Sequence, residues 1–240
     1  MEWTADAVVL GARPHGESSV VLEVMTAEHG RHLGLVKGGR SRRMQPMLQP
    51  GNTLRATWRA RLDSHLGLFT AETLVSRAAT LMASAVGLHG VQVIAAHLRY
   101  LPERDPHPAL HSAAGVILDH LSDPADAVRL IVRFELALLD ELGFGLDLSR
   151  CAATGADTDL AWVSPKTGRA VGREAGLPWR DRLLPLPPFL LDPTRAERPD
   201  AAALRAALAL TGHFLDRHVA GPRSQPLSPS RAALAGLLEG

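Results

Sequence analysis

Residues 37–43 read KGGRSRR and combine two glycines with four cationic side chains. This combination suits phosphate binding, because glycine lets the backbone approach an anion while lysine and arginine supply charge. The stretch from His29 to Leu62 holds eight Lys and Arg residues and no Asp or Glu, which leaves 18 basic against 25 acidic residues elsewhere. Charge segregated in this way is typical of a surface that binds a polyanion. The alternative is a solvated basic loop with no partner.

Residues 53–61 alternate between apolar and mostly cationic side chains, which adds further candidates for binding an anion. Leu54, Ala56, Trp58 and Ala60 fall on one face of a strand, and Arg55, Thr57, Arg59 and Arg61 fall on the other. Trp58 then points into the core, which argues against a role in base stacking. The candidate nucleic-acid-binding residues are therefore Lys37, Arg40, Arg42, Arg43, Arg55, Arg59 and Arg61.

The elements that must position these cations are short strands. Runs rich in β-formers, separated by turn signals, occupy residues 7–10, 20–25, 32–36, 53–61 and 66–75. Five short strands with a long connection after the third indicate a small closed barrel of the OB kind. We therefore expect an OB-fold domain over residues 1–76, whose open face in such folds commonly binds oligonucleotides.

After residue 76 the apolar residues recur at the spacing of helices. Helices are predicted over residues 76–101, 109–121, 125–142, 201–219 and 231–239, with Asp200 as an N-cap. Residues 146–193 are rich in Gly and Pro and form an irregular insert. The predicted fold class is α+β, with a barrel followed by a mainly helical domain over residues 77–240.

Composition excludes several classes of function. The N-terminus lacks a secretory signal pattern, and no apolar run approaches the length of a membrane span. The single cysteine, Cys151, fits a reducing compartment, so we expect a soluble, cytoplasmic protein. Neither Lys37 nor Lys166 follows the glycine pattern of a phosphate-binding loop, which argues against an ATPase. No constellation of catalytic side chains is apparent, so no enzyme activity is expected.

Four stretches together resemble a known family, the recombination mediator RecO. They are HGESSVVLEVMTAEHG (15–30), KGGRSRR running into LQPGNTL (37–54), RFELALLDELGFGLDLSRCAATG (133–155) and GPRSQPLSPSR (221–231). The resemblance implies an N-terminal OB domain, a helical C-terminal domain, binding of single- and double-stranded DNA, and annealing of complementary strands. It also implies two protein partners, RecR and the single-stranded-DNA-binding protein SSB, and a bacterial, nucleoid-associated location.

The resemblance also points to a site for the tail of SSB, which ends in acidic residues followed by apolar ones. Arg129 and Arg133 lie four residues apart on the third long helix, beside apolar neighbours. The RFE region of the family contributes to such a site, so both arginines are candidates for binding the SSB tail. The alternative is a surface arginine that pairs with a local glutamate, either Glu135 or Glu141.

One departure from the family concerns zinc. Many members place two Cys-x-x-Cys pairs in the insert, whereas this chain has Cys151 and Thr154 at the first pair and residues near Gly172 and Ala175 at the second. One ligand cannot hold a structural zinc ion, which needs four donors. We therefore expect no metal and no other cofactor, with Cys151 as a small buried apolar residue. The insert would be held by packing of Leu160, Trp162, Val163, Val171 and Trp179.

These patterns lead to one preferred interpretation and two alternatives. The preferred one is a DNA repair and recombination mediator that binds and anneals DNA. With RecR it would help to load recombinase onto SSB-coated single strands. One alternative is an RNA-binding OB-fold protein. The other is an adaptor whose basic face binds RecR and not DNA.

Overall fold

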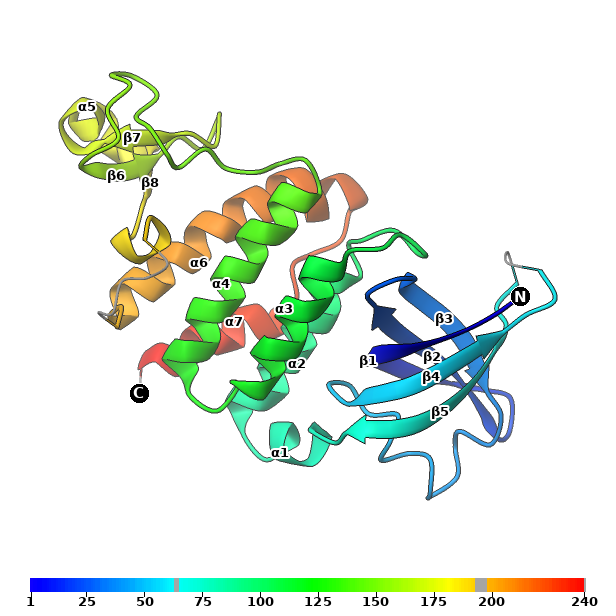
Figure 1. The fold of residues 1–240 in the computed structure, drawn as a ribbon. Helices are drawn as coiled ribbons and strands as arrows, with labels where there is room; N and C mark the ends of the chain where they lie inside the picture. The colour runs from blue at the N-terminus through cyan, green and yellow to red at the C-terminus, as the bar shows by residue number, and fades with distance from the viewer. Residues whose placement is uncertain (63–64, 193–197, 240) are drawn as a thin grey trace. The chain divides into compact units, whose positions relative to one another are not determined.

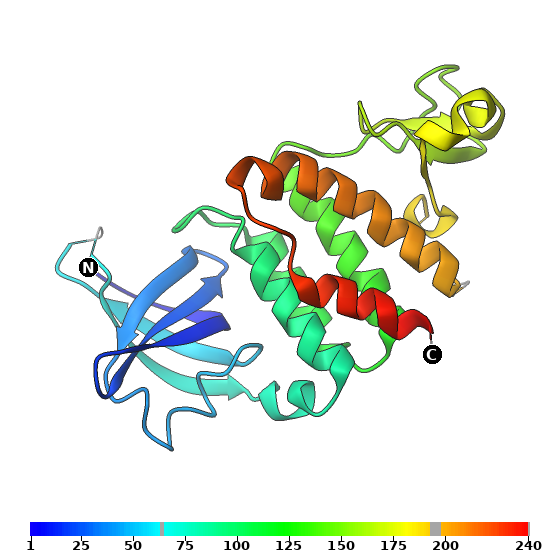
Figure 2. The same cartoon turned by 180° about the vertical axis from the view of Figure 1, so that it is seen from behind.

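The chain folds into two compact units. The computed structural model describes residues 1–62, 65–192 and 198–239, and the units run from Met1 to Ser122 and from Asp123 to Gly240 (Figures 1 and 2). This division groups the helices of residues 77–122 with the barrel. The domain boundary after residue 76 therefore stays a prediction from the sequence pattern.

Five strands close into a barrel in the first unit, which confirms the predicted OB-type architecture. The strands are β1 (Glu2–His15), β2 (Ser19–Thr26), β3 (Gly30–Val36), β4 (Thr53–Arg59) and β5 (Leu68–Val75). Their order around the barrel is β1-β2-β3-β5-β4, visible in blue and cyan in Figure 1. Four of the neighbouring pairs are antiparallel, and β3 meets β5 in parallel at Leu35 and Leu68.

The barrel core follows the alternation predicted for β4. Leu54, Ala56 and Trp58 are buried, while Arg55 and Arg59 are exposed. Trp58 has no exposed surface, and its indole N–H donates to the carbonyl of Leu66 at 3.0 Å. The tryptophan is therefore a core residue, as predicted.

Three helices complete the first unit: α1 (Ala78–Met82), α2 (Ala85–Leu98) and α3 (Pro108–Asp119). The sequence predicted one helix over residues 76–101, but the chain breaks it between α1 and α2. The Ser84 hydroxyl caps α2 by accepting the Gly87 N–H at 3.0 Å. Gly87 packs so tightly that a Cβ atom there would lie 2.4 Å from the Leu81 carbonyl oxygen. The break thus needs both a capping residue and a glycine.

The second unit is built on the helices α4 (Pro124–Glu141), α6 (Ala201–Leu215) and α7 (Pro229–Gly236). Both views show α4 and α6 side by side. The Asp123 carboxylate caps α4 by accepting the N–H groups of Ala125 and Asp126 at 2.9 and 3.0 Å. Asp200 caps α6 by accepting the Ala203 N–H at 2.7 Å, which confirms the predicted N-cap.

The insert contains a small three-stranded sheet in the order β7-β6-β8. Its elements are β6 (Leu160–Val163), β7 (Ala170–Gly172), α5 (Arg173–Gly176) and β8 (Leu184–Pro185), with a helical turn at Leu177–Arg182. Leu160, Val163 and Val171 are buried and Trp162 is half-buried, as their predicted packing role requires.

Trp179 was also predicted to pack inside the insert, and that prediction is wrong. The residue is 57% exposed. The space is already filled, because Gly176 lies so close to the Trp162 ring that a Cβ atom there would come within 2.4 Å of it. The turn that carries Trp179 therefore lies on the surface.

No helix in the part of the chain that the structure describes is long and apolar enough to cross a membrane.

Candidate nucleic-acid interface

The basic loop after β3 is anchored to the barrel at Gly39. This glycine is buried, and a Cβ atom there would lie 2.5 Å from a methyl carbon of Val20. Leu48, further along the loop, is buried in the barrel core. Gly39 therefore serves packing, whereas the neighbouring Gly38, with φ of +68° and open space around it, is the glycine that leaves room for a ligand.

Arg40 ties this loop to the turn between β1 and β2. One nitrogen of its guanidinium donates to the carbonyls of Gly16 at 3.0 Å and Glu17 at 2.9 Å. Its backbone N–H donates to the Ser18 carbonyl at 3.0 Å. Because its partners are carbonyls and not carboxylates, Arg40 fixes the loop and still contributes a positive charge.

Lys37, Arg42 and Arg43 are the exposed cations of the loop. Within the described residues none of them forms an ion pair with a carboxylate, so their charge is available to an anion. The loop thus presents a rigid base with three accessible cationic side chains, an arrangement that can bind phosphates through charge-assisted hydrogen bonds.

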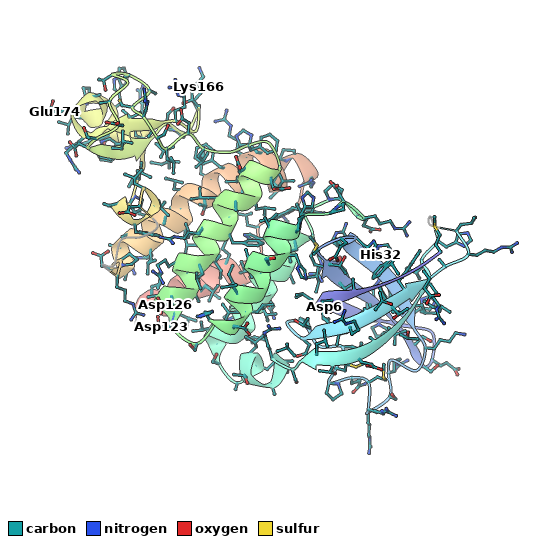
Figure 3. All side chains as sticks on the ribbon, viewed as in Figure 1. Asp6, His32, Asp123, Asp126, Lys166 and Glu174 are labelled. Carbon is teal, nitrogen blue, oxygen red and sulfur yellow. The ribbon has the colours of Figure 1, made fainter. Side chains whose placement is uncertain are left out.

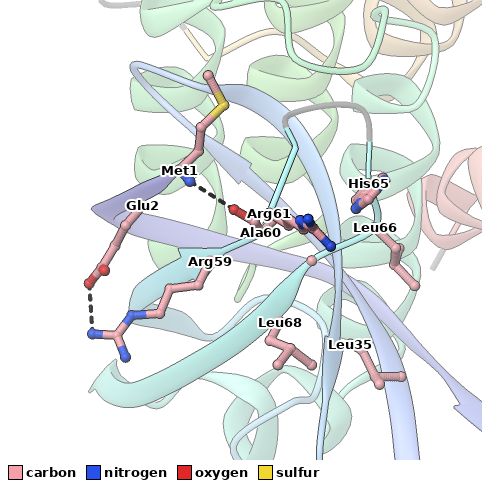
Figure 4. Close-up of a pocket in the computed structure, with 10 residues that line it drawn as sticks. Met1, Glu2, Leu35, Arg59, Ala60, Arg61, His65, Leu66 and Leu68 are labelled. Carbon is pink, nitrogen blue, oxygen red and sulfur yellow. Dashed lines mark hydrogen bonds and ion pairs between the residues drawn. The ribbon is translucent and has the colours of Figure 1, made fainter.

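Arg55 and Arg59 differ, because acidic residues on β1 lie opposite them. The pairing of β1 with β4 places Asp6 beside Arg55 and Glu2 beside Arg59. The ion pair of Arg55 Nε with Asp6 Oδ1 measures 3.0 Å, and Figure 3 labels Asp6. The ion pair of an Arg59 terminal nitrogen with Glu2 Oε1 measures 2.7 Å and is drawn in Figure 4. The hydrogen bond and charge of Glu2 raise the pKa of Arg59 above its ordinary value. The outward face of β4 is therefore less cationic than its sequence indicates.

The sequence held a signal for this pairing that the prediction missed. Glu2 and Asp6 are four residues apart, as are Arg55 and Arg59, and two antiparallel strands in register bring both pairs together. The first strand was predicted to begin at Ala7, which left both acids outside it.

Arg61 follows β4 and lines a pocket of about 740 Å³. Leu35, Leu66 and Leu68 supply apolar lining, and His65 and Arg59 lie at the same opening (Figure 4). The N-terminal amine of Met1 closes one side by donating to the Ala60 carbonyl at 2.7 Å. Arg61 is exposed and forms no ion pair with any described residue. A lining of this kind can accept a nucleotide, which has an apolar base and an anionic phosphate.

Aromatic side chains of the barrel are turned inward. Trp58 and Phe69 are buried, and the half-buried Trp3 stacks on His29 with ring centroids 4.3 Å apart. Trp3 also lies against Trp58 at 5.9 Å. The described residues of the barrel therefore offer cations without an exposed aromatic platform, as the position of Trp58 in the sequence pattern indicated.

The second pair of candidate residues lies on α4. Arg129 forms an ion pair with Asp126 at 3.5 Å, one turn earlier on the helix (Figure 3). Arg133 is half-buried and donates to the Phe189 carbonyl at 3.3 Å. Burial, followed by repulsion from Arg129, lowers the pKa of Arg133. A partly desolvated guanidinium beside apolar surface is suited to holding a carboxylate.

Comparison with known proteins decides the family. The family model described as "Recombination protein O N terminal" matches residues 1–77, and the one described as "Recombination protein O C terminal" matches residues 86–226. The chain belongs to the RecO family. Membership places it among proteins of DNA repair and recombination.

Its RecO relatives are similar over nearly their whole length. The DNA repair protein RecO of Chelativorans sp. (strain BNC1) is 62% identical over 232 residues, which cover 97% of this chain and 93% of the relative. The DNA repair protein RecO of Methylorubrum extorquens is 60% identical, with coverage of 99% and 98%. The corresponding protein of Sinorhizobium medicae (strain WSM419) is 58% identical, with coverage of 96% and 92%.

Two of the stretches that resemble RecO meet in the second unit. Glu135, from the RFE stretch, has no exposed surface and accepts two hydrogen bonds from Arg231, at 2.7 and 2.9 Å. Arg231 ends the GPRSQPLSPSR stretch and lies on α7. The Thr211 hydroxyl on α6 also donates to Glu135. This buried cluster joins three helices, so these two stretches carry a structural role.

The insert does not fit the zinc ion that the RecO resemblance implies. Cys151 is buried, and its Sγ accepts the Gly172 N–H at 3.2 Å. Thr154 and Gly172 occupy positions where other ligands would be needed, and the described residues contain no group of three or more His, Cys, Asp or Glu that could hold a metal. Burial of the thiol opposes its ionisation, but hydrogen bonds from Thr154 and Gly172 prevail and lower the pKa of Cys151 to about 7.

Proposed function

We propose that the chain is a recombination mediator that binds single- and double-stranded DNA through the barrel. Lys37, Arg40, Arg42, Arg43 and Arg61 are the principal phosphate contacts, and Arg55 and Arg59 are secondary ones. The chain anneals complementary strands and, with RecR, helps to load recombinase onto SSB-coated single strands. It acts in the cytoplasm with the nucleoid, without a cofactor and without catalysing a reaction.

The observation that carries this proposal is the set of exposed cations on an anchored loop, which pair with no carboxylate among the described residues. Each neutralised phosphate releases condensed counterions, so affinity should fall steeply with salt. About four contacts to a single strand give a log–log slope near −3. The same surface favours annealing, because it lowers the repulsion between two phosphate backbones.

A salt series with matched variants tests the proposal. Fluorescence anisotropy of labelled oligo-dT would be measured for the intact chain, for Arg42→Gln with Arg43→Gln, and for Arg55→Gln with Arg59→Gln. Both variants lose two positive charges, so their slopes should change equally if DNA affinity depends only on the net charge of the protein. Direct contact by the loop predicts that the first variant flattens the slope by about 1.4 units, and the second by less than half of that. Arg40 is left in place because it supports the loop.

Two results would contradict the proposal. If the two variants flattened the slope equally, the loop would not be the specific contact for DNA. If binding were unchanged in both variants, DNA would bind to another surface of the protein. A titration with purified RecR then tests the adaptor alternative. That alternative predicts that the loop variant loses affinity for RecR and keeps its affinity for DNA. Competition between RNA and DNA of equal length separates the RNA-binding alternative, since preference for RNA would favour it.

We also assign Arg129 and Arg133 to binding the C-terminal tail of SSB. Support comes from the half-buried guanidinium of Arg133, whose partial desolvation suits it to pairing with an acidic residue of the tail. Arg133 is the stronger candidate, because burial lowers the pKa of its guanidinium.

A further inference from the structure

The exposed aromatic surface that the barrel lacks among its described residues is found on the insert. Eight of the ten aromatic side chains are buried or half-buried. The exceptions are Phe144, 40% exposed and stacked on His218 with centroids 4.8 Å apart, and Trp179, 57% exposed. An indole exposed to this extent offers a large flat face that a ligand can cover.

The turn that carries Trp179 is held at its base. The Arg173 N–H donates to the Asp159 carbonyl at 2.9 Å, and Arg173 Nε pairs with the Asp159 carboxylate at 3.0 Å. Gly176 lies directly against the half-buried ring of Trp162 on β6, the central strand of the β7-β6-β8 sheet. Figure 3 shows this region, marked by Lys166 and Glu174. A ring presented from a fixed base loses little freedom when a ligand binds.

Two cationic residues, Arg180 and Arg182, follow Trp179 closely in the sequence. The Arg182 guanidinium lies over the indole, 5.9 Å from its centroid, and the ring keeps its exposure with that group in place. Arg182 forms no ion pair with a described carboxylate. Arg180 pairs only loosely with Asp181 at 3.6 Å, and both side chains are largely exposed. A flat ring close to two exposed guanidinium groups has the chemistry to stack a base and to hold its phosphates.

We infer that Trp179, with Arg180 and Arg182, is a stacking contact for a base of single-stranded DNA. The inference rests on the proposed DNA-binding function and adds a second contact that lies on the other unit of the chain. It separates two chemical tasks: the barrel loop neutralises phosphates, and the insert holds an unpaired base. Duplex DNA keeps its bases stacked inside the helix, so this contact discriminates in favour of single strands.

Three variants of the intact chain test the contact. Trp179→Leu keeps an apolar side chain and removes the ring, whereas Trp179→Phe retains a ring. Leu177→Ala removes a neighbouring exposed apolar residue, 53% exposed, from the same turn. Circular dichroism verifies each fold, and anisotropy reports affinity for oligo-dT and for a duplex of the same length.

The stacking contact predicts a selective pattern. Trp179→Leu should weaken oligo-dT binding roughly tenfold, Trp179→Phe should weaken it less, and Leu177→Ala should leave it unchanged. Binding to the duplex should not change in any of the three. In addition, an oligo-dT carrying a photoreactive iodouracil should crosslink to the peptide that contains Trp179.

Other results overturn the inference in distinguishable ways. If the intact chain binds oligo-dT and Trp179→Leu binds it equally well, the stacking contact is wrong and the loop proposal stands. If Leu177→Ala weakens binding as much as Trp179→Leu, the turn acts as a general apolar surface for a protein, and stacking is excluded. If the intact chain binds no DNA, the proposed function itself fails.

Discussion

Cys151 is a buried cysteine whose sulfur is approached by several hydrogen-bond donors. The hydrogen bonds from Thr154 and the backbone that approach its sulfur would support a metal-bound thiolate, and here they support the ionised thiol alone. The pKa of about 7 lies below the ordinary value of 9.0. A depressed pKa means that the thiolate stabilises the folded state at high pH, and that this contribution is lost as the pH falls through 7.

The thiol should therefore titrate near neutral pH. Because the chain has one cysteine, ultraviolet thiolate absorbance of the folded protein should rise with a midpoint near pH 7. Thr154→Val should move the midpoint upward, since it removes a donor to the sulfur. Cys151→Ser supplies the baseline, and a midpoint near 9 in the unmodified chain would show that these hydrogen bonds do not stabilise the thiolate.

The outward direction of individual arginines was predicted from the sequence, but their partners were missed. The alternation of β4 correctly turned Arg55 and Arg59 outward, because side-chain direction follows from strand period alone. Their ion pairs depend on strand register with Glu2 and Asp6, some fifty residues earlier in the chain. Similarly, Trp179 was predicted to pack in the core of the insert because its side chain is apolar. The space inside the insert depends instead on the close contact between Gly176 and the Trp162 ring, which the sequence pattern does not show.

At the scale of elements, α7 is held to α4 and α6 by the buried pair of Arg231 and Glu135. Arg231→Ala would leave a buried carboxylate without its partner, and we expect a loss of about 3–5 kcal/mol in the free energy of unfolding. Urea denaturation measures this loss.

A double substitution provides the control for this pair. Glu135→Leu with Arg231→Met replaces both charges with apolar side chains of similar size, so it should be much less destabilising than Arg231→Ala. Thr211 keeps a partner in either variant, because its hydroxyl also bonds the Ala207 carbonyl at 3.1 Å. If the double variant were as unstable as the single one, the cost would arise from packing and not from an unpaired charge.

Elements with a strong period were predicted well. The strands β2 to β5 and the helices α3, α4, α6 and α7 lie near their predicted ranges, whereas β1 extends five residues beyond its predicted range at each end. The division of α1 from α2 was missed, because the apolar period runs on through Ser84 and only the close approach of Gly87 to Leu81 requires the turn.

For the whole molecule, the basic loop and the proposed site for the SSB tail lie on different compact units. The basic loop belongs to Met1–Ser122, and Arg133 belongs to Asp123–Gly240. Arg42→Gln with Arg43→Gln should therefore reduce DNA affinity and leave the affinity for an SSB tail peptide unchanged. Arg133→Gln should do the reverse, with a loss of about tenfold or more for the peptide, as expected when one charged hydrogen bond is removed.

Anisotropy with labelled oligo-dT and with labelled peptide measures both affinities for each variant. Arg205→Gln, an exposed arginine on α6, controls for a change of charge in the second unit. If either variant weakened both ligands to the same degree, the two sites would not be independent and the assignment of separate surfaces would fail.

The double role of β1 also sets the order in which the barrel is completed. Residues 7–15 pair with β2, which is adjacent in the chain, whereas residues 2–8 pair with β4, about fifty positions later. On the ribosome the first hairpin can therefore form as soon as Thr26 has emerged, while the start of β1 waits for Arg59. During that interval Trp3 and its neighbours form an open strand edge, the kind of edge that favours aggregation. The start of β1 is thus protected only after a partner strand about fifty positions later has been synthesised.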